Sequence, residues 1–80
     1  MIQVKVRLYA TLSGYNPAGQ GNSPFTVEVP QGTSVAELLN KLEVPGEEVK
    51  QIFIRYKART RDFTLEDGDQ IALFPAVAGG

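Results

Sequence analysis

Residues 33–46, TSVAELLNKLEVPG, decide the fold because they contain the one helix signal of the chain. Ser34 and Glu37 have the spacing of a capping box, in which the serine hydroxyl accepts from the Glu37 backbone and the carboxylate reaches back. Thr33 is the other candidate cap. Apolar residues recur at i, i+3, i+4 and i+7, at Val35, Leu38, Leu39 and Leu42. This stripe predicts a single amphipathic helix, stopped by residues 45–46, Pro-Gly.

On both sides of this helix, apolar and polar residues alternate with the period of two that is typical of β-strands. Strands are expected at residues 1–9, 25–29, 51–57 and 70–75, with a short apolar pair at Phe63 and Leu65 as a further strand. Residues 14–24 contain three Gly and two Pro and are expected to form a long, mobile surface loop. One helix on one face of a mixed sheet of four to five strands is an α+β architecture.

The composition excludes several classes of protein. The 80 residues include no His, Cys or Trp, and the formal net charge is −1. Without His and Cys there is no imidazole general base, disulfide scaffold or cysteine metal site. The near-neutral charge favours no nucleic-acid partner, and no apolar run approaches the roughly 20 residues of a membrane span. With no leader-like segment recognised, we expect one small cytoplasmic domain that binds no metal.

Residues 76–80, AVAGG, carry no charge and no bulky side chain, so they are expected to form a flexible tail after a domain of residues 1–75. One interpretation is a frayed terminus. The other is that the tail is a substrate, because a terminal glycine has no Cβ and leaves its carboxyl carbon unhindered. On the tail alone, the two interpretations stay open.

Three stretches resemble the MoaD/ThiS sulfur-carrier family: LYA at residues 8–10, VPQGTSVAELL at 29–39 and LEDGDQIALFPAVAGG at 65–80. The resemblance covers nearly the whole chain and implies the ubiquitin-like β-grasp fold. The chain departs from the family at residues 55–59, RYKAR, where the family usually has an Asn-Gly turn. No residue there favours the positive φ angles of a type I′ turn, so we expect a longer or irregular connection.

The resemblance also implies a chemistry. A ubiquitin-activating-like enzyme would adenylate Gly80 with ATP, and a sulfur donor would convert it to a thiocarboxylate. Gly79, Ala78 and Val77 would thread into a partner's active site. The chain would be a cosubstrate with no catalytic residue and no bound cofactor of its own. The closest likeness is to the small subunit of molybdopterin synthase, whose large subunit inserts the sulfur during molybdenum cofactor biosynthesis.

The sequence is also compatible with other functions. They are a sulfur carrier for cysteine, thiamine or tungsten-cofactor biosynthesis, a modifier joined to lysine through Gly80, and a ubiquitin-like binding module that does not use its C-terminus.

Four residues are expected to dock partner proteins. The alternation puts three of them, Tyr9, Phe53 and Phe74, on the face away from the helix. The fourth is Pro75, which directly follows Phe74. Clustered apolar side chains on a surface mark partner sites. The alternative is that Phe53 or Tyr9 only covers the edge of the core.

Two groups of charged residues also have two interpretations each. The basic side chains at residues 55, 57, 59 and 61 are interpreted mainly as a solvated sheet edge, with an acidic partner as the alternative. The carboxylates at residues 47–48 and 66–69 lack a His beside them, so neither is predicted to hold a metal or to act as an acid–base pair.

Overall fold

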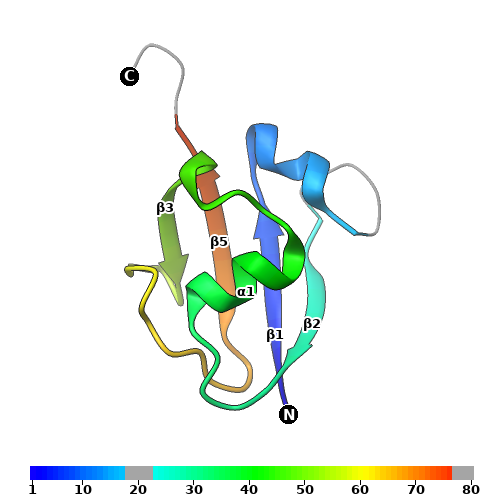
Figure 1. Cartoon of the computed structure of the whole chain (residues 1–80), viewed down its shortest axis with the longest axis vertical. Coiled ribbons are helices and arrows are strands. Elements are labelled where there is room, and N and C mark those ends of the chain that lie inside the picture. Colours follow the sequence, from blue (N-terminus) through cyan, green and yellow to red (C-terminus); the bar gives the residue numbers. More distant parts are fainter. Residues whose placement is uncertain (18–22, 77–80) are drawn as a thin grey trace.

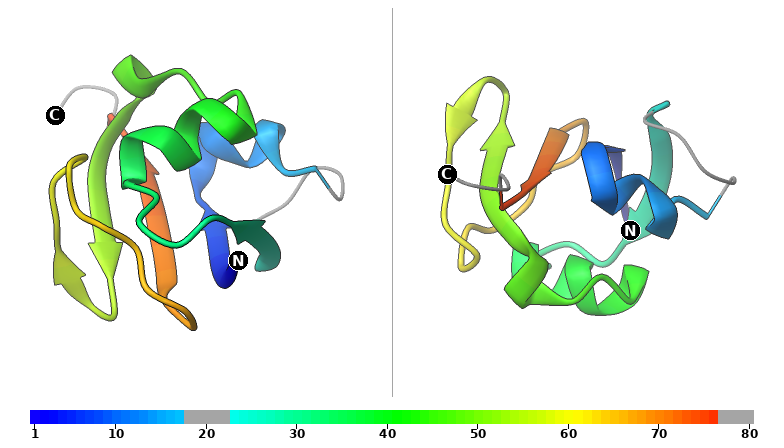
Figure 2. Two further views of the ribbon diagram at one scale, coloured as in Figure 1. Left: turned by 60° about the horizontal axis from the view of Figure 1, so that its bottom comes forward. Right: turned by 90° about the horizontal axis from the view of Figure 1, so that it is seen from above.

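The computed structural model, which describes residues 1–17 and 23–76, is a five-stranded mixed sheet with one helix across one face (Figures 1 and 2). The strand order is β2-β1-β5-β3-β4. The strands are β1 (Ile2–Leu8), β2 (Phe25–Val29), β3 (Val49–Ile54), β4 (Lys57–Ala58) and β5 (Gln70–Pro75). The α-helix is α1 (Val35–Leu42), and two 3-10 helices are η1 (Ala10–Tyr15) and η2 (Gly46–Glu48). The expected α+β architecture is confirmed.

Strand β5 is the centre of the sheet. It pairs in parallel with β1, where Val6 faces Ile71 and Leu8 faces Leu73, and antiparallel with β3. Beyond β1, the Tyr9 N–H donates to the Leu73 carbonyl at 3.2 Å. The expected antiparallel hairpin of β1 and β2 is also present. Strand β5 therefore joins the β1–β2 half of the sheet to the β3–β4 half.

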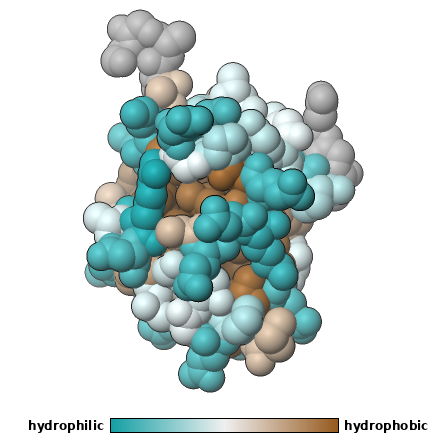
Figure 3. Space-filling view, viewed as in Figure 1, coloured by the Kyte–Doolittle hydropathy of each residue, from teal (hydrophilic) through white to brown (hydrophobic). Residues whose placement is uncertain are grey.

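The core lies between α1 and the inner face of the sheet. Along β1 every second residue is buried, as the alternation predicted. The largest fully buried side chains of the described residues are Leu8, Leu12, Leu38, Ile54, Leu65, Ile71 and Leu73. Seen from the helix side in Figure 3, hydrophilic side chains lie over this apolar interior, which shows between them. None of the helices within residues 1–17 and 23–76 is long and apolar enough to cross a membrane.

Helix α1 begins as predicted and ends earlier than predicted. The Glu37 N–H donates to Ser34 Oγ at 3.2 Å, and the Ser34 N–H donates to Glu37 Oε1 at 3.0 Å, so Ser34 is the cap. The Thr33 hydroxyl instead donates to the Pro30 carbonyl. The helix ends at Leu42 because Glu43 takes the left-handed conformation, with φ of 59°. Pro45 then precedes η2 and does not itself stop α1.

The expectation of a loop over residues 14–24 is wrong in its first part. Helix η1 extends to Tyr15, and Leu12 within it is fully buried. Tyr15 packs against the core, and its hydroxyl donates to Glu48 Oε2 at 3.1 Å. Desolvation and this contact with a carboxylate raise the pKa of Tyr15 above its ordinary value. The hydroxyl therefore keeps its proton and ties η1 to η2.

The expected strand over residues 51–57 is shifted, and the connection after it is short. Strand β3 ends at Ile54, which pairs with Lys57, so only Arg55 and Tyr56 form the turn. Their φ angles are 54° and 69°, the positive values that a two-residue type I′ turn requires. The prediction of a longer or irregular connection is therefore wrong. The turn matches the twist of the flanking strands, and the Arg55 N–H donates to the Gln70 carbonyl at 3.2 Å.

The extra short strand also lies elsewhere than expected. It is β4, directly after the turn, and not the stretch at Phe63 and Leu65. Leu65 is buried and Phe63 packs against the core, and Thr64 between them forms an isolated bridge with Ser34. This stretch therefore supplies core side chains without being a strand.

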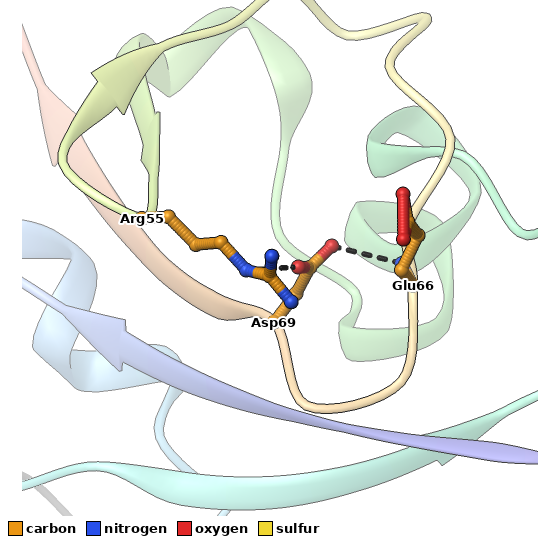
Figure 4. Close-up of polar contacts among 3 residues, drawn as sticks. All are labelled: Arg55, Glu66 and Asp69. Atoms are coloured by element: carbon orange, nitrogen blue, oxygen red, sulfur yellow. Dashed lines mark hydrogen bonds and ion pairs between the residues drawn. The ribbon is translucent and has the colours of Figure 1, made fainter.

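A buried carboxylate holds the turn before β5 (Figure 4). Asp69 is 2% exposed, and its Oδ2 accepts from the Glu66 N–H at 2.8 Å. Its Oδ1 lies 3.0 Å from Arg55 Nε, whose side chain is 62% exposed. Gly68, with φ of 86°, donates its N–H to the Gln3 carbonyl at 2.8 Å. Asp69 thus links the start of β5 to the β3–β4 turn.

Replacing the helix cap should destabilise the fold. Ser34→Ala removes the oxygen that accepts from the Glu37 N–H, so we expect the free energy of unfolding to fall by about 1 kcal/mol. Urea unfolding followed by circular dichroism measures this. Asn40→Ala changes an exposed helical side chain that caps neither end of the helix, so this control should not lose stability. Equal stability of Ser34→Ala and the parent chain would contradict the capping assignment.

Removing the buried carboxylate should lower the free energy of unfolding by more than removing the helix cap. Asp69→Ala leaves the Glu66 N–H without its acceptor and Arg55 without its counterion, so we expect a loss of about 2 kcal/mol. The N–H contributes most of it, because an ion pair with an exposed arginine is worth little. Glu66→Ala, which removes an exposed carboxylate from the same turn, should change stability by less than about 0.5 kcal/mol. Equal effects of the two substitutions in urea unfolding would overturn the role given to Asp69.

Candidate functional site

Three aromatic side chains predicted from the alternation meet on the face of the sheet away from α1. The rings of Tyr9 and Phe74 are stacked, with centroids 4.5 Å apart and planes at 9°. Phe53 meets Phe74 edge to face, with centroids 5.6 Å apart. We call these three residues the aromatic cluster. Each is partly exposed, so the cluster combines a fixed geometry with surface that a partner can bury.

The topology explains why residues so distant in sequence meet. Tyr9 follows β1, Phe74 lies in β5 and Phe53 lies in β3, and these three strands are neighbours in the sheet. Side chains on one face of adjacent strands lie within contact distance. The cluster therefore depends on β5 pairing on both of its edges.

The aromatic cluster lines a shallow depression of about 700 Å³ on this outer face. Its other lining residues are Lys5, Arg7, Pro24, Arg55, Tyr56, Gln70, Ile71 and Ala72. The lining includes three cationic side chains and no Asp or Glu. The depression is therefore an apolar floor with a basic surround, a combination that suits docking more than catalysis.

Pro75, the fourth predicted docking residue, ends β5 and pairs with Val49. It is partly buried and directly follows Phe74, so the chain leaves the sheet beside the aromatic cluster. The predicted site residues Val77, Ala78, Gly79 and Gly80 lie outside the described residues. The structure thus brings together the predicted docking residues and leaves the predicted tail chemistry untested.

Two kinds of lining residue were missed by sequence reasoning. Lys5 and Arg7 share the outward phase of Tyr9 along β1, so the alternation itself could have placed them beside the cluster. Tyr56 could not have been found in this way. In the strand expected over residues 51–57 it would share a face with Ile52 and Ile54, but the turn begins before it and leaves it 92% exposed.

The basic residues after β3 do not form one continuous row. Arg55 pairs with Asp69, the Arg59 guanidinium lies 4.8 Å from the centre of the Phe63 ring, and Arg61 Nη2 donates to the Val49 carbonyl at 2.6 Å. These contacts give the three arginines roles in the fold. Among residues 1–17 and 23–76, no group of three carboxylates is placed to hold a metal ion.

Solved structures show the same fold. A putative molybdopterin converting factor subunit 1 from Pyrococcus furiosus superposes with a TM-score of 0.72 at 23% identity, covering 96% of this chain and 100% of that one. Subunit 1 in a complex of subunits 1 and 2 of the molybdopterin-converting factor from Helicobacter pylori gives 0.63 at 22% identity, with 99% and 100% covered. Small archaeal modifier protein 1 from Haloferax volcanii gives a TM-score of 0.72 at 16% identity, with 96% of this chain and 100% of that one covered.

Among curated proteins no significant match is found. A family model does match, and it is that of the ThiS family, over residues 17–80. The match includes the helix, the turn before β5, the strand β5 itself and the final Gly-Gly. The family resemblance noted in the sequence is thereby confirmed, and the chain belongs to the ThiS family.

Proposed function

We propose that this chain is a sulfur carrier whose Gly80 is the carboxyl terminus that is adenylated and converted to a thiocarboxylate. The observation that carries the proposal is the ThiS family match, which runs through the terminal Gly-Gly. The chain has no Cys to hold a persulfide, so Gly80 is the position where sulfur can be attached. The chain would act as a cosubstrate, with the catalytic groups on its partners.

The chemistry follows from the properties of a carboxyl terminus. Its pKa is about 3.3–3.7, so at neutral pH it is a carboxylate and a poor electrophile. A carboxylate oxygen attacks the α-phosphate of ATP on the activating enzyme, forming the acyl-adenylate and releasing pyrophosphate. A sulfide or persulfide donor then attacks the carbonyl carbon and AMP leaves. When the donor is a persulfide, a thiol must afterwards reduce the S–S bond to free the thiocarboxylate.

The described site supports docking of the partner that performs these steps. Gly80 is the fifth residue after Pro75, and a chain of that length spans at most about 17 Å when extended. Pro75 directly follows Phe74 of the aromatic cluster. A partner bound to this cluster therefore has Gly80 within about 17 Å of the point where it contacts the chain. The absence of charged or bulky side chains at residues 76–80 suits entry into a narrow active site.

For the acceptor, we propose the pterin precursor of the molybdenum cofactor, with the chain as the small subunit of molybdopterin synthase. The support is the likeness to the two molybdopterin converting factor subunits, one of them solved with its subunit 2. The second candidate is a protein modifier that forms an isopeptide bond to lysine. The likeness to small archaeal modifier protein 1 favours it.

Intact mass of the chain distinguishes these outcomes. After incubation with the adenylating enzyme of the same genome, ATP and a sulfur donor, we expect one oxygen to be replaced by sulfur at Gly80. Deletion of residues 79–80 should abolish this change, because the reacting carboxyl group is lost. Omission of ATP is the matched control.

Other masses would point elsewhere. A mass increase from linkage to lysine of another protein would support the modifier. No ATP-dependent change, together with full activity of the chain after deletion of residues 79–80, would overturn both proposals.

The aromatic cluster should be required for docking. Phe74→Ser removes the ring that contacts both Tyr9 and Phe53, so we expect the affinity for the adenylating enzyme to fall by at least about tenfold. Isothermal titration calorimetry measures it, with circular dichroism confirming the fold. Phe74→Tyr, which keeps the ring, should bind within about twofold of the parent chain. Unchanged affinity of Phe74→Ser would show that the cluster is not the docking surface.

A further inference from the structure

Tyr56 occupies a position that the fold alone does not favour for tyrosine. It is the second residue of the β3–β4 turn, with φ of 69°, and it follows Arg55, which has φ of 54°. Positive φ is strained for residues with a large side chain, whereas Gly and Asn adopt it readily. Two such residues in succession therefore make this turn a site of backbone strain, of the kind that collects at functional surfaces.

Arg55 and Tyr56 differ in what the fold gains from them. Arg55 pairs with the buried Asp69, so its side chain has a structural role. Tyr56 is 92% exposed, and it has no hydrogen bond or ring contact with any other described residue. Only one other large apolar side chain of the described residues, Met1, is similarly exposed, at 75%. The strain at Tyr56 is thus not offset by a contact within the domain.

Tyr56 instead lines the depression that contains the aromatic cluster. The same depression is lined by Lys5 and Arg7, and neither forms an ion pair in the part of the chain that the structure describes. Arg7 Nη1 lies 3.4 Å from the Tyr9 hydroxyl, which directs its charge toward the cluster. A carboxylate arriving here would meet uncompensated positive charge beside exposed aromatic surface.

We propose that Tyr56 is a partner-selecting residue, and that the depression binds a segment of a protein partner in which an acidic side chain stands beside a bulky apolar one. The acidic side chain is recognised by Lys5 and Arg7, and the apolar one packs against Tyr56 and the aromatic cluster. This inference rests on the proposed function, because the partner is the adenylating enzyme that activates Gly80.

Calorimetric titration of the full chain with that enzyme, without ATP, tests the surface separately from the chemistry. Tyr56→Asn should weaken binding by about tenfold. Its midpoint of thermal unfolding should be unchanged or raised by up to about 4 °C, because Asn relieves the strain. Tyr56→Phe keeps the ring and should bind within about twofold of the parent chain.

The charges are tested by a second pair of variants. The double variant Lys5→Gln/Arg7→Gln should weaken binding by about tenfold at low salt and lose less affinity than the parent chain when salt is raised. Lys41→Gln, which removes an exposed charge from α1 on the opposite face, is the matched control and should bind normally.

Three results would overturn the inference: parent-like binding by Tyr56→Asn, a fall of its unfolding midpoint by several degrees, or no binding of the parent chain to the enzyme. The ATP-dependent mass change of the parent chain is read in parallel. If the variants weaken binding as expected but no thiocarboxylate forms, the sulfur-carrier function is wrong and the proposed binding surface is supported. If thiocarboxylate forms equally on the parent chain and on Tyr56→Asn, and the two bind with equal affinity, the proposed binding surface is wrong and the sulfur-carrier function is supported.

Discussion

The parallel pairing of β1 with β5 is the constraint on which the rest of the structure depends. It places the two strands that are farthest apart in sequence side by side, in register from Lys5 with Gln70 to Leu8 with Leu73. Without it, the hairpin of β1 and β2 has no contact in the sheet with β3 and β4. The core is closed only when β5 lies between them and buries Ile71 and Leu73 under α1. A domain this small is only marginally stable, so losing this junction should unfold it.

The same pairing organises the outer face. Inward side chains of β1 and β5 build the core, so their outward neighbours are brought together as a consequence. Tyr9 and Phe74 stack because the registers of the two strands align them. The surface with which the chain meets other proteins is therefore fixed by the pattern that stabilises its interior. A substitution in the core that shifts this register would also disperse the aromatic cluster.

Much of the fold could be predicted because its determinants are local. The capping box at Ser34, the alternation along β1 and the bounds of β5 each follow from residues close together in sequence. The β3–β4 turn could not be predicted in this way. Arg55 and Tyr56 have no preference for positive φ, and their conformation is imposed by the strand pairs that flank them and by Asp69. Tertiary contacts outweighed local propensity there.

For the site, the aromatic cluster was predicted because β-strand alternation directly gives the face of each residue. Tyr56 was expected inside a strand because that strand was predicted to end at residue 57, whereas β3 ends at Ile54. An error of three residues in the end of a strand changes the environment of every residue after its true end. The buried state of Asp69 was also out of reach. Its partners are a backbone N–H and a side chain of a different turn, and neither leaves a signature in the sequence.

The central position of β5 has a mechanical consequence. A partner that draws on residues beyond Pro75 pulls along the axis of a strand that is hydrogen-bonded on both edges, to β1 and to β3. Ladder hydrogen bonds lie across the strand direction, so such a pull stretches them together in shear and does not open them one after another. A peripheral strand such as β2, bonded on one edge, would give a weaker anchor. The sheet can thus keep its hydrogen bonds while the chain beyond Pro75 is drawn into another protein.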